Sequence, residues 1–172
     1  NVIDGVAFAD YGNGSSIASH GGRFVVGGDK VARIYEFTGA AAELRATLQG
    51  RHTTTISSVA FSDDGTLVAT GDTNHLIIVW SAADATIVHN DLVFHRSRVQ
   101  SIMFAPGSNT RMVSAAVDSQ VIAWDLAANK RVIVAGAHTS GVNAVTFGAN
   151  ANEVISGGGD GSVKRWALVW EA

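Results

Sequence analysis

Three sets of residues in this sequence combine the side-chain types of a proton relay: an imidazole, a hydroxyl and an acid or amide, followed each time by an indole. They are His52, Thr70, Asn74 and Trp80; His95, Ser114, Asp118 and Trp124; and His138, Ser156, Asp160 and Trp166. A serine, a histidine and an aspartate can form the nucleophile, the base and the orienting acid of a hydrolase. The same groups can instead satisfy one another's hydrogen bonds inside a protein core.

The spacing of the three sets favours the second interpretation. The histidines recur at a period of about 43 residues, and the other members follow them at nearly the same offsets. A structural network recurs with its unit, whereas an active site does not. We therefore predict three structural tetrads, no catalytic residue and no enzyme. Because Asn74 can accept the same hydrogen bond without a charge, its tetrad should be closed but weaker.

The histidines do not indicate a metal or cofactor site either. The period places His52, His95 and His138 in different units, and no cluster of His or carboxylate residues has ligand spacing. The stretch from Gly22 to Lys30 is rich in glycine, but no Ser or Thr follows the lysine as a phosphate loop requires. We therefore expect no metal and no cofactor.

Each tetrad must be positioned by a unit of short strands. A strand of constant pattern follows each histidine, at residues 56–61, 99–104 and 142–147, and a second strand begins at Leu67, Met112 or Val154. The tryptophan lies in a third strand, and a more polar fourth strand fits residues 86–94 and 131–137. Four strands in about 43 residues form the repeating unit of a β-propeller, so the predicted class is all-β.

The units divide the chain into five segments. Residues 1–14 are expected to end a preceding unit, and residues 15–48 form a degenerate unit in which Tyr35 stands at the tryptophan position. Glycines at 21–22 and 27–28 break that unit into three strands, and residues 44–48 are expected to close it as an outer strand. Three regular units follow at 49–94, 95–137 and 138–172.

The composition limits the classes of function. The 172 residues are 47% hydrophobic and 16% charged, with a net charge of −3. This charge balance argues against nucleic acid or an anionic membrane as the main partner. The chain has no cysteine, which excludes disulfides and thiolate metal sites. No apolar run reaches the length of a membrane span.

The tetrads resemble the pattern of WD40 repeats. That pattern has a histidine, a Ser or Thr in the second strand, an Asp in the next turn and a Trp-Asp pair ending the third strand. The pair is intact at Trp124-Asp125 and altered at Trp80-Ser81 and Trp166-Ala167. The resemblance implies four four-stranded antiparallel blades of a seven-bladed propeller. Since seven such blades need about 300 residues, further blades from the same or another chain should close the ring.

Two stretches are similar to the C-terminal repeats of the actin-interacting protein 1 family. They are LVATGDTNHLIIVWS, from Leu67 to Ser81, and LVFHRSRVQSIMFAP, from Leu92 to Pro106. The resemblance implies a cytoplasmic, non-catalytic scaffold that promotes disassembly of cofilin-decorated actin filaments, with actin filaments and cofilin as partners. The alternative is a general WD40 adaptor or assembly platform, such as a substrate receptor of a ubiquitin ligase. An enzyme built on a propeller is a third reading, but no polar cluster outside the repeat supports it.

One loop is a candidate for partner binding. Arg96 and Arg98 precede the first strand of a unit in a chain that has few charges. In WD40 propellers such loops lie on the face that most often holds partners, and arginine is enriched in binding hot spots. The alternative is that both arginines are ordinary solvated loop residues.

Overall fold

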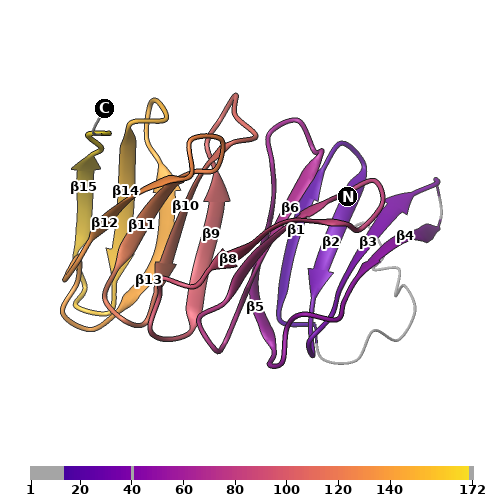
Figure 1. Cartoon of the computed structure of the whole chain (residues 1–172), viewed down its shortest axis with the longest axis horizontal. Helices are drawn as coiled ribbons and strands as arrows, with labels where there is room; N and C mark the ends of the chain where they lie inside the picture. Colours follow the sequence, from indigo (N-terminus) through magenta and orange to yellow (C-terminus); the bar gives the residue numbers. More distant parts are fainter. Residues whose placement is uncertain (1–13, 40, 171–172) are drawn as a thin grey trace, which may run out of the picture.

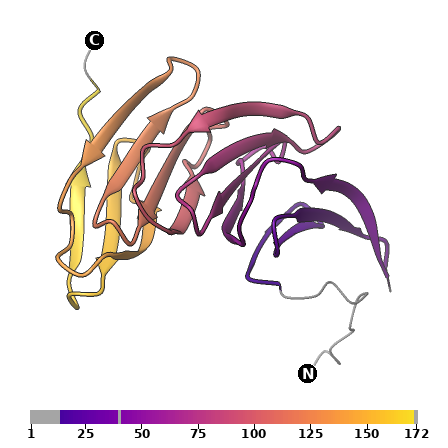
Figure 2. The same ribbon diagram turned by 60° about the horizontal axis from the view of Figure 1, so that its bottom comes forward.

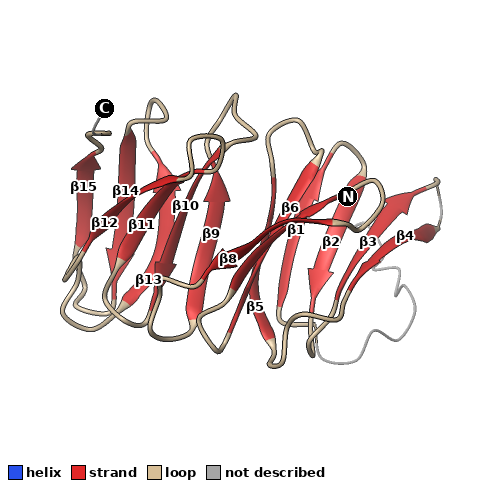
Figure 3. Cartoon of the chain, in the orientation of Figure 1, coloured by secondary structure: helices blue, strands red, loops and turns tan. Residues whose placement is uncertain are grey.

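The computed structural model describes residues 14–39 and 41–170, and every regular element in these ranges is a β-strand (Figure 3). No helix that could span a membrane occurs in this part of the chain. The expected end of a preceding unit, residues 1–14, lies almost wholly outside the described residues. The strands form four antiparallel sheets in chain order (Figure 1).

Three sheets have four strands and one has three, each ordered as in the sequence. The first contains β1 (Ser16–His20), β2 (Arg23–Gly27), β3 (Ala32–Phe37) and β4 (Ala42–Leu48), and the second contains β5 (Ile56–Phe61), β6 (Leu67–Asp72), β7 (Ile77–Ser81) and β8 (Ile87–Leu92). The third contains β9 (Val99–Phe104), β10 (Arg111–Ala116), β11 (Val121–Asp125) and β12 (Lys130–Val134). The fourth contains β13 (Val142–Phe147), β14 (Glu153–Gly158) and β15 (Val163–Ala167).

The all-β class and the blade architecture are therefore confirmed, with one correction. The fourth sheet was expected to have four strands, but the described residues after β15 form no further strand. Instead, the Trp170 ring lies under the guanidinium of Arg111, with 5.2 Å between Cζ and the ring centroid. This contact joins the segment after β15 to β10 of the third sheet. The division at residues 48, 94 and 137 stays a prediction.

The sheets stack side by side along an arc, as Figure 2 shows, and their first strands are neighbours: β1 with β5, β5 with β9, and β9 with β13. Serine hydroxyls link these strands across the sheets. Ser57 donates a hydrogen bond to the carbonyl of Val99 at 2.6 Å, and Ser16 accepts one from the amide of Val59 at 3.1 Å. These bonds satisfy polar groups at the boundary and hold the sheets in register.

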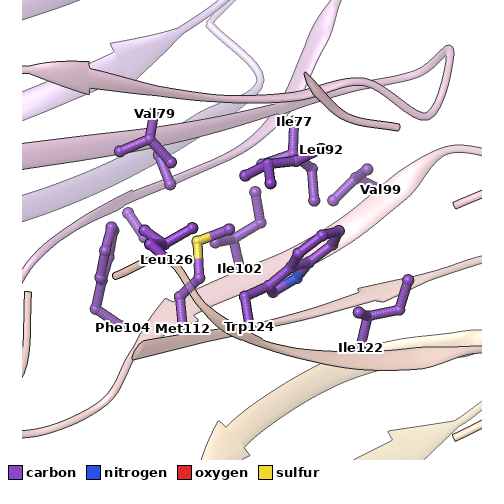
Figure 4. Packing of buried hydrophobic residues seen from close by; sticks show 12 residues of the cluster. Ile77, Val79, Leu92, Val99, Ile102, Phe104, Met112, Ile122, Trp124 and Leu126 are labelled. Atoms are coloured by element: carbon purple, nitrogen blue, oxygen red, sulfur yellow. The ribbon is translucent and has the colours of Figure 1, made fainter. Parts of the chain in front are cut away.

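Each boundary between sheets is a separate hydrophobic cluster. In Figure 4, Ile77 and Val79 of β7 lie above Val99, Ile102 and Met112 of the third sheet. Equivalent clusters join the first sheet to the second and the third to the fourth. Each fully buried aliphatic side chain contributes about 1.5–3 kcal/mol to stability. Packing between neighbouring sheets therefore provides the core.

Glycine allows the closest approach at two of these boundaries. A Cβ on Gly27 would lie 2.7 Å from Cγ2 of Ile56, and one on Gly71 would lie 2.7 Å from Cγ1 of Val99. In β14, Gly157 holds the same position, opposite Ala144, but a Cβ there would meet nothing within 4 Å. Within the described residues, the far face of the fourth sheet is therefore uncovered.

Candidate functional site: the histidine tetrads and the loops they hold

The tetrad of the third sheet forms one continuous hydrogen-bond chain. Trp124 Nε1 donates to Ser114 Oγ at 2.9 Å, and Ser114 Oγ lies 2.8 Å from His95 Nε2. His95 Nδ1 lies 3.1 Å from Asp118 Oδ2. Since indole can only donate and an ionised carboxylate can only accept, a neutral imidazole fits with Nδ1–H toward Asp118 and the Ser114 hydroxyl donating to Nε2. The chain joins β10, β11, the turn between them and the loop before β9.

The fourth sheet contains the same arrangement. Trp166 Nε1 donates to Ser156 Oγ at 2.8 Å, Ser156 Oγ lies 2.8 Å from His138 Nε2, and His138 Nδ1 lies 2.9 Å from Asp160 Oδ1. The Ser162 hydroxyl donates a further hydrogen bond to Asp160 Oδ1 at 2.7 Å. The structure thus brings together all four residues of each of these two tetrads.

The second sheet closes its tetrad with a different acid. His52 Nε2 lies 2.7 Å from Thr70 Oγ1, to which Trp80 Nε1 donates at 2.8 Å, but His52 Nδ1 faces Asp72 Oδ2 at 2.9 Å. The prediction that Asn74 accepts this hydrogen bond is wrong. The Asn74 side chain is exposed, and its backbone N–H donates to Asp72 Oδ1 at 2.9 Å.

The register explains the exchange. Asp72 pairs with Ile56 at the end of β6, where the third and fourth sheets have Ala116 and Gly158. Neither alanine nor glycine has a side chain that could reach the histidine. The signal in the sequence was therefore an aspartate at a position where the other units have alanine or glycine.

The first sheet replaces the tetrad with apolar and aromatic contacts. By register, Val26 stands at the hydroxyl position and Tyr35 at the tryptophan position. The Phe24 ring stacks on Tyr35 at 5.2 Å between centroids. This sheet is therefore stabilised by ring packing at the position where the others use a polar network.

The tetrad carboxylates are held in the ionised form. Burial raises the pKa of Asp118, but hydrogen bonds from His95 and from the N–H of Arg96 outweigh it and keep the pKa below its ordinary value. The same balance lowers the pKa of Asp72, with His52 and the N–H of Leu76 as donors. Hydrogen bonds from the Ser162 hydroxyl and from His138 hold the pKa of Asp160 far below its ordinary range. Three fixed negative charges therefore lie beneath the loops.

The geometry gives the tetrad hydroxyls a structural role. The side chains of Thr70, Ser114 and Ser156 are at most 2% exposed, and each oxygen already accepts a tryptophan N–H. A nucleophile must meet its substrate, which these buried oxygens cannot do. No group of three or more potential metal ligands occurs in the described ranges.

The tetrads also hold the loops that carry the candidate arginines. Asp118 Oδ2 accepts the backbone N–H of Arg96 at 2.7 Å, and the carbonyl of Arg98 accepts the N–H of Val117 at 3.0 Å. Both arginine side chains are exposed. The loop is thus fixed through its backbone while its charges face solvent, and its role in partner binding stays a proposal.

The family model for the WD domain, G-beta repeat, matches residues 42–81 and 129–167. The chain belongs to the WD40 repeat family. Each match begins in or just before the fourth strand of one sheet and ends in the third strand of the next. One WD40 repeat of the sequence therefore contributes to two neighbouring blades and ties them together.

Two known relatives show which WD40 proteins this chain resembles. It is 33% identical to the 66 kDa stress protein of Physarum polycephalum, over 81% of this chain and 23% of that protein. It is 32% identical to actin-interacting protein 1 of Caenorhabditis elegans, over 90% of this chain and 26% of that protein. The predicted resemblance to actin-interacting protein 1 is confirmed. The chain spans about a quarter of the length of these relatives.

Similarity to a solved structure supports the WD40 fold, but not a function. The structure of U3-55K superposes with a TM-score of 0.80 at 20% identity, over 93% of this chain and 50% of that one. The sheets and their stacking are therefore shared with a known protein of similar architecture.

Proposed function

We propose that this chain is a non-catalytic interaction scaffold and the C-terminal part of an actin-interacting protein 1-like factor that promotes cofilin-dependent disassembly of actin filaments. The observation that carries the proposal is the 32% identity to actin-interacting protein 1 over 90% of this chain. The proposed partners are actin filaments and cofilin, in the cytoplasm.

The site geometry supports a scaffold role. The tetrads place their polar groups in the interior, where they hold loops, and the exposed Arg96 and Arg98 lie on a loop fixed by Asp118. A fixed loop loses little conformational entropy when a partner binds, so its contacts contribute more to affinity. We therefore propose Arg96 and Arg98 as partner contacts.

Co-sedimentation with actin filaments, bare and cofilin-decorated, tests the function. We expect this chain to pellet with decorated filaments and less with bare ones, and an R96S/R98S variant to pellet less than the parent chain. The longer protein that contains these blades serves as the positive control. If that protein also stays in the supernatant with decorated filaments, the actin role is wrong.

The second candidate is a general WD40 adaptor or assembly platform, such as a ubiquitin-ligase substrate receptor. The tetrads and stacked sheets favour it, since the repeat family as a whole has them and the fold hosts many partners. Failure of the longer protein to bind decorated actin would support this candidate.

A further inference from the structure

One rim of the blade array carries four exposed cationic side chains that have no ion-pair partner among the described residues. This rim lies where β2 ends and β9 begins, at the bottom of Figure 1, and comprises the turns after β2, β6, β10 and β14 and the loops before β5, β9 and β13. Its exposed cationic side chains are Lys30, Arg51, Arg96 and Arg98. Within residues 14–39 and 41–170, none of the four side chains forms an ion pair or a hydrogen bond.

The carboxylates on the same rim already accept hydrogen bonds within the protein. Asp72, Asp118 and Asp160 accept hydrogen bonds from the tetrad histidines and from backbone N–H groups. Asp29 accepts one from the Thr55 hydroxyl at 3.2 Å and remains exposed beside Lys30, so Lys30 contributes less than the arginines. Three of the four carboxylates are thus turned inward, while the arginines point outward.

The opposite rim has acidic turns and cations that are already engaged. Its turns at residues 21–22, 62–66, 82–86, 105–110, 126–129 and 148–152 contain Asp63, Asp64 and Asp84. The guanidinium of Arg23 donates to the carbonyl of Gly65 at 2.9 Å, and that of Arg111 contacts Asp125 and Asn152. The chain as a whole carries a net charge of −3. The basic rim has as many carboxylates as cations, but its cations are exposed, whereas the side chains of Asp72, Asp118 and Asp160 are 1%, 6% and 16% exposed. The charges that this rim presents to solvent are therefore mainly positive, which favours oriented approach of an anionic partner.

We propose that this basic rim, formed by Arg51, Arg96 and Arg98 with Lys30 at its end, binds an extended acidic segment of a partner protein. The cations lie on loops of three successive sheets, so a segment that contacts all of them must run along the arc. Arginine pairs with carboxylates through two parallel hydrogen bonds. A single exposed ion pair contributes little, but several on fixed loops add up.

Nucleic acid fits this rim less well. Single-stranded binding sites combine positive charge with aromatic rings on which bases stack. The aromatic ring beside the arginine loop is Phe94, and the Arg131 guanidinium covers it at 3.4 Å from the centroid. The charge on the rim is therefore present without an open stacking surface.

Fluorescence anisotropy with a fluorescein-labelled poly-glutamate peptide of about twelve residues tests the proposal on this chain. We expect binding at about 50 mM salt that weakens strongly at about 300 mM, because exposed charges are screened. The R96S/R98S variant should bind at least about tenfold more weakly. The matched control R45S/R165S removes the same charge from exposed arginines that pair with Glu36 and Glu153 on strands, and should bind like the parent.

Equal affinity of R96S/R98S and R45S/R165S would overturn the proposal, with circular dichroism confirming that both are folded. Tighter binding of a labelled poly-dT of equal length than of poly-glutamate would also overturn it, in favour of nucleic acid. The probe contains neither actin nor cofilin, so a failure of the actin role leaves this result unchanged.

Discussion

In each of three successive sheets an aspartate accepts a hydrogen bond from the tetrad histidine: Asp72, Asp118 and Asp160. Asp72 does so from the end of its strand, whereas the other two do so from the turn that follows the strand. The residues that follow the turn acid or amide share a left-handed backbone: His75, Ser119 and Gly161 have φ values of 66°, 69° and 74°. By this criterion Asn74 is equivalent to Asp118 and Asp160, although it does not touch the histidine. The turn conformation is thus conserved between sheets, while the acid has moved two residues upstream in one of them.

Replacing Asp72 should therefore be costly and replacing Asn74 should not. In D72A, Nδ1–H of His52 and the N–H groups of Asn74 and Leu76 lose their acceptor inside the protein, which should cost about 1–3 kcal/mol or more. N74A removes an exposed side chain, so its free energy of unfolding should stay within about 0.5 kcal/mol of the parent. Urea unfolding followed by tryptophan fluorescence measures both. If N74A lowered the free energy of unfolding as much as D72A, Asn74 rather than Asp72 would have to be counted as a tetrad residue.

Stability should also fall in acid because of these carboxylates. The pKa values of Asp72 and Asp118 are lowered in the folded state, so the unfolded chain binds protons first as the pH falls. Their stabilisation is complete above the ordinary Asp pKa of about 3.9 and is lost as the pH drops through the folded values. Urea unfolding midpoints measured at neutral pH and at steps below about pH 4 should show this loss. In D118N the midpoint should fall less steeply with decreasing pH. An unchanged slope in D118N would contradict the assignment.

At the scale of elements, the strands that repeat were predictable and the contacts between repeats were not. Residues 56–61, 99–104 and 142–147 coincide with β5, β9 and β13, because each repeats the same apolar pattern. The contact of Trp170 with Arg111 joins the segment after β15 to the third sheet, and no local pattern signals it. The partner of His52 was missed for a similar reason, since register, not spacing from the tryptophan, determines which acid reaches it.

The register of β8 shows a further limit of sequence reasoning. Its pairing with β7 shifts twice, between Ile77 and Val79 and between Val79 and Trp80. β-bulges of this kind depend on how an edge strand twists over its neighbour. The strand itself was expected within residues 86–94, but its irregular pairing follows only from the three-dimensional arrangement.

For the whole molecule, the second and third sheets each present one face to the sheet before and the other to the sheet after. Val121 and Ala123 of β11 are buried against the fourth sheet, whereas the equivalent Val163 of β15 is 76% exposed. Gly157 likewise faces open space where Gly71 meets Val99 and Ile102. The uncovered face therefore has the composition of an interface between blades, and we expect a further blade to cover it.

Paired glycine substitutions test this expectation. G71V should lower the free energy of unfolding by about 1–3 kcal/mol or more, because its side chain would overlap Val99 and Ile102. G157V should change the free energy of unfolding of this chain by no more than about 0.5 kcal/mol, since nothing lies within contact distance. In a longer protein that supplies the next blade, G157V should become as destabilising as G71V, because the added blade would bring its first strand against β14. Urea unfolding of both variants in both chain lengths measures the difference. A G157V that remains neutral in the longer protein would show that no blade packs on this face.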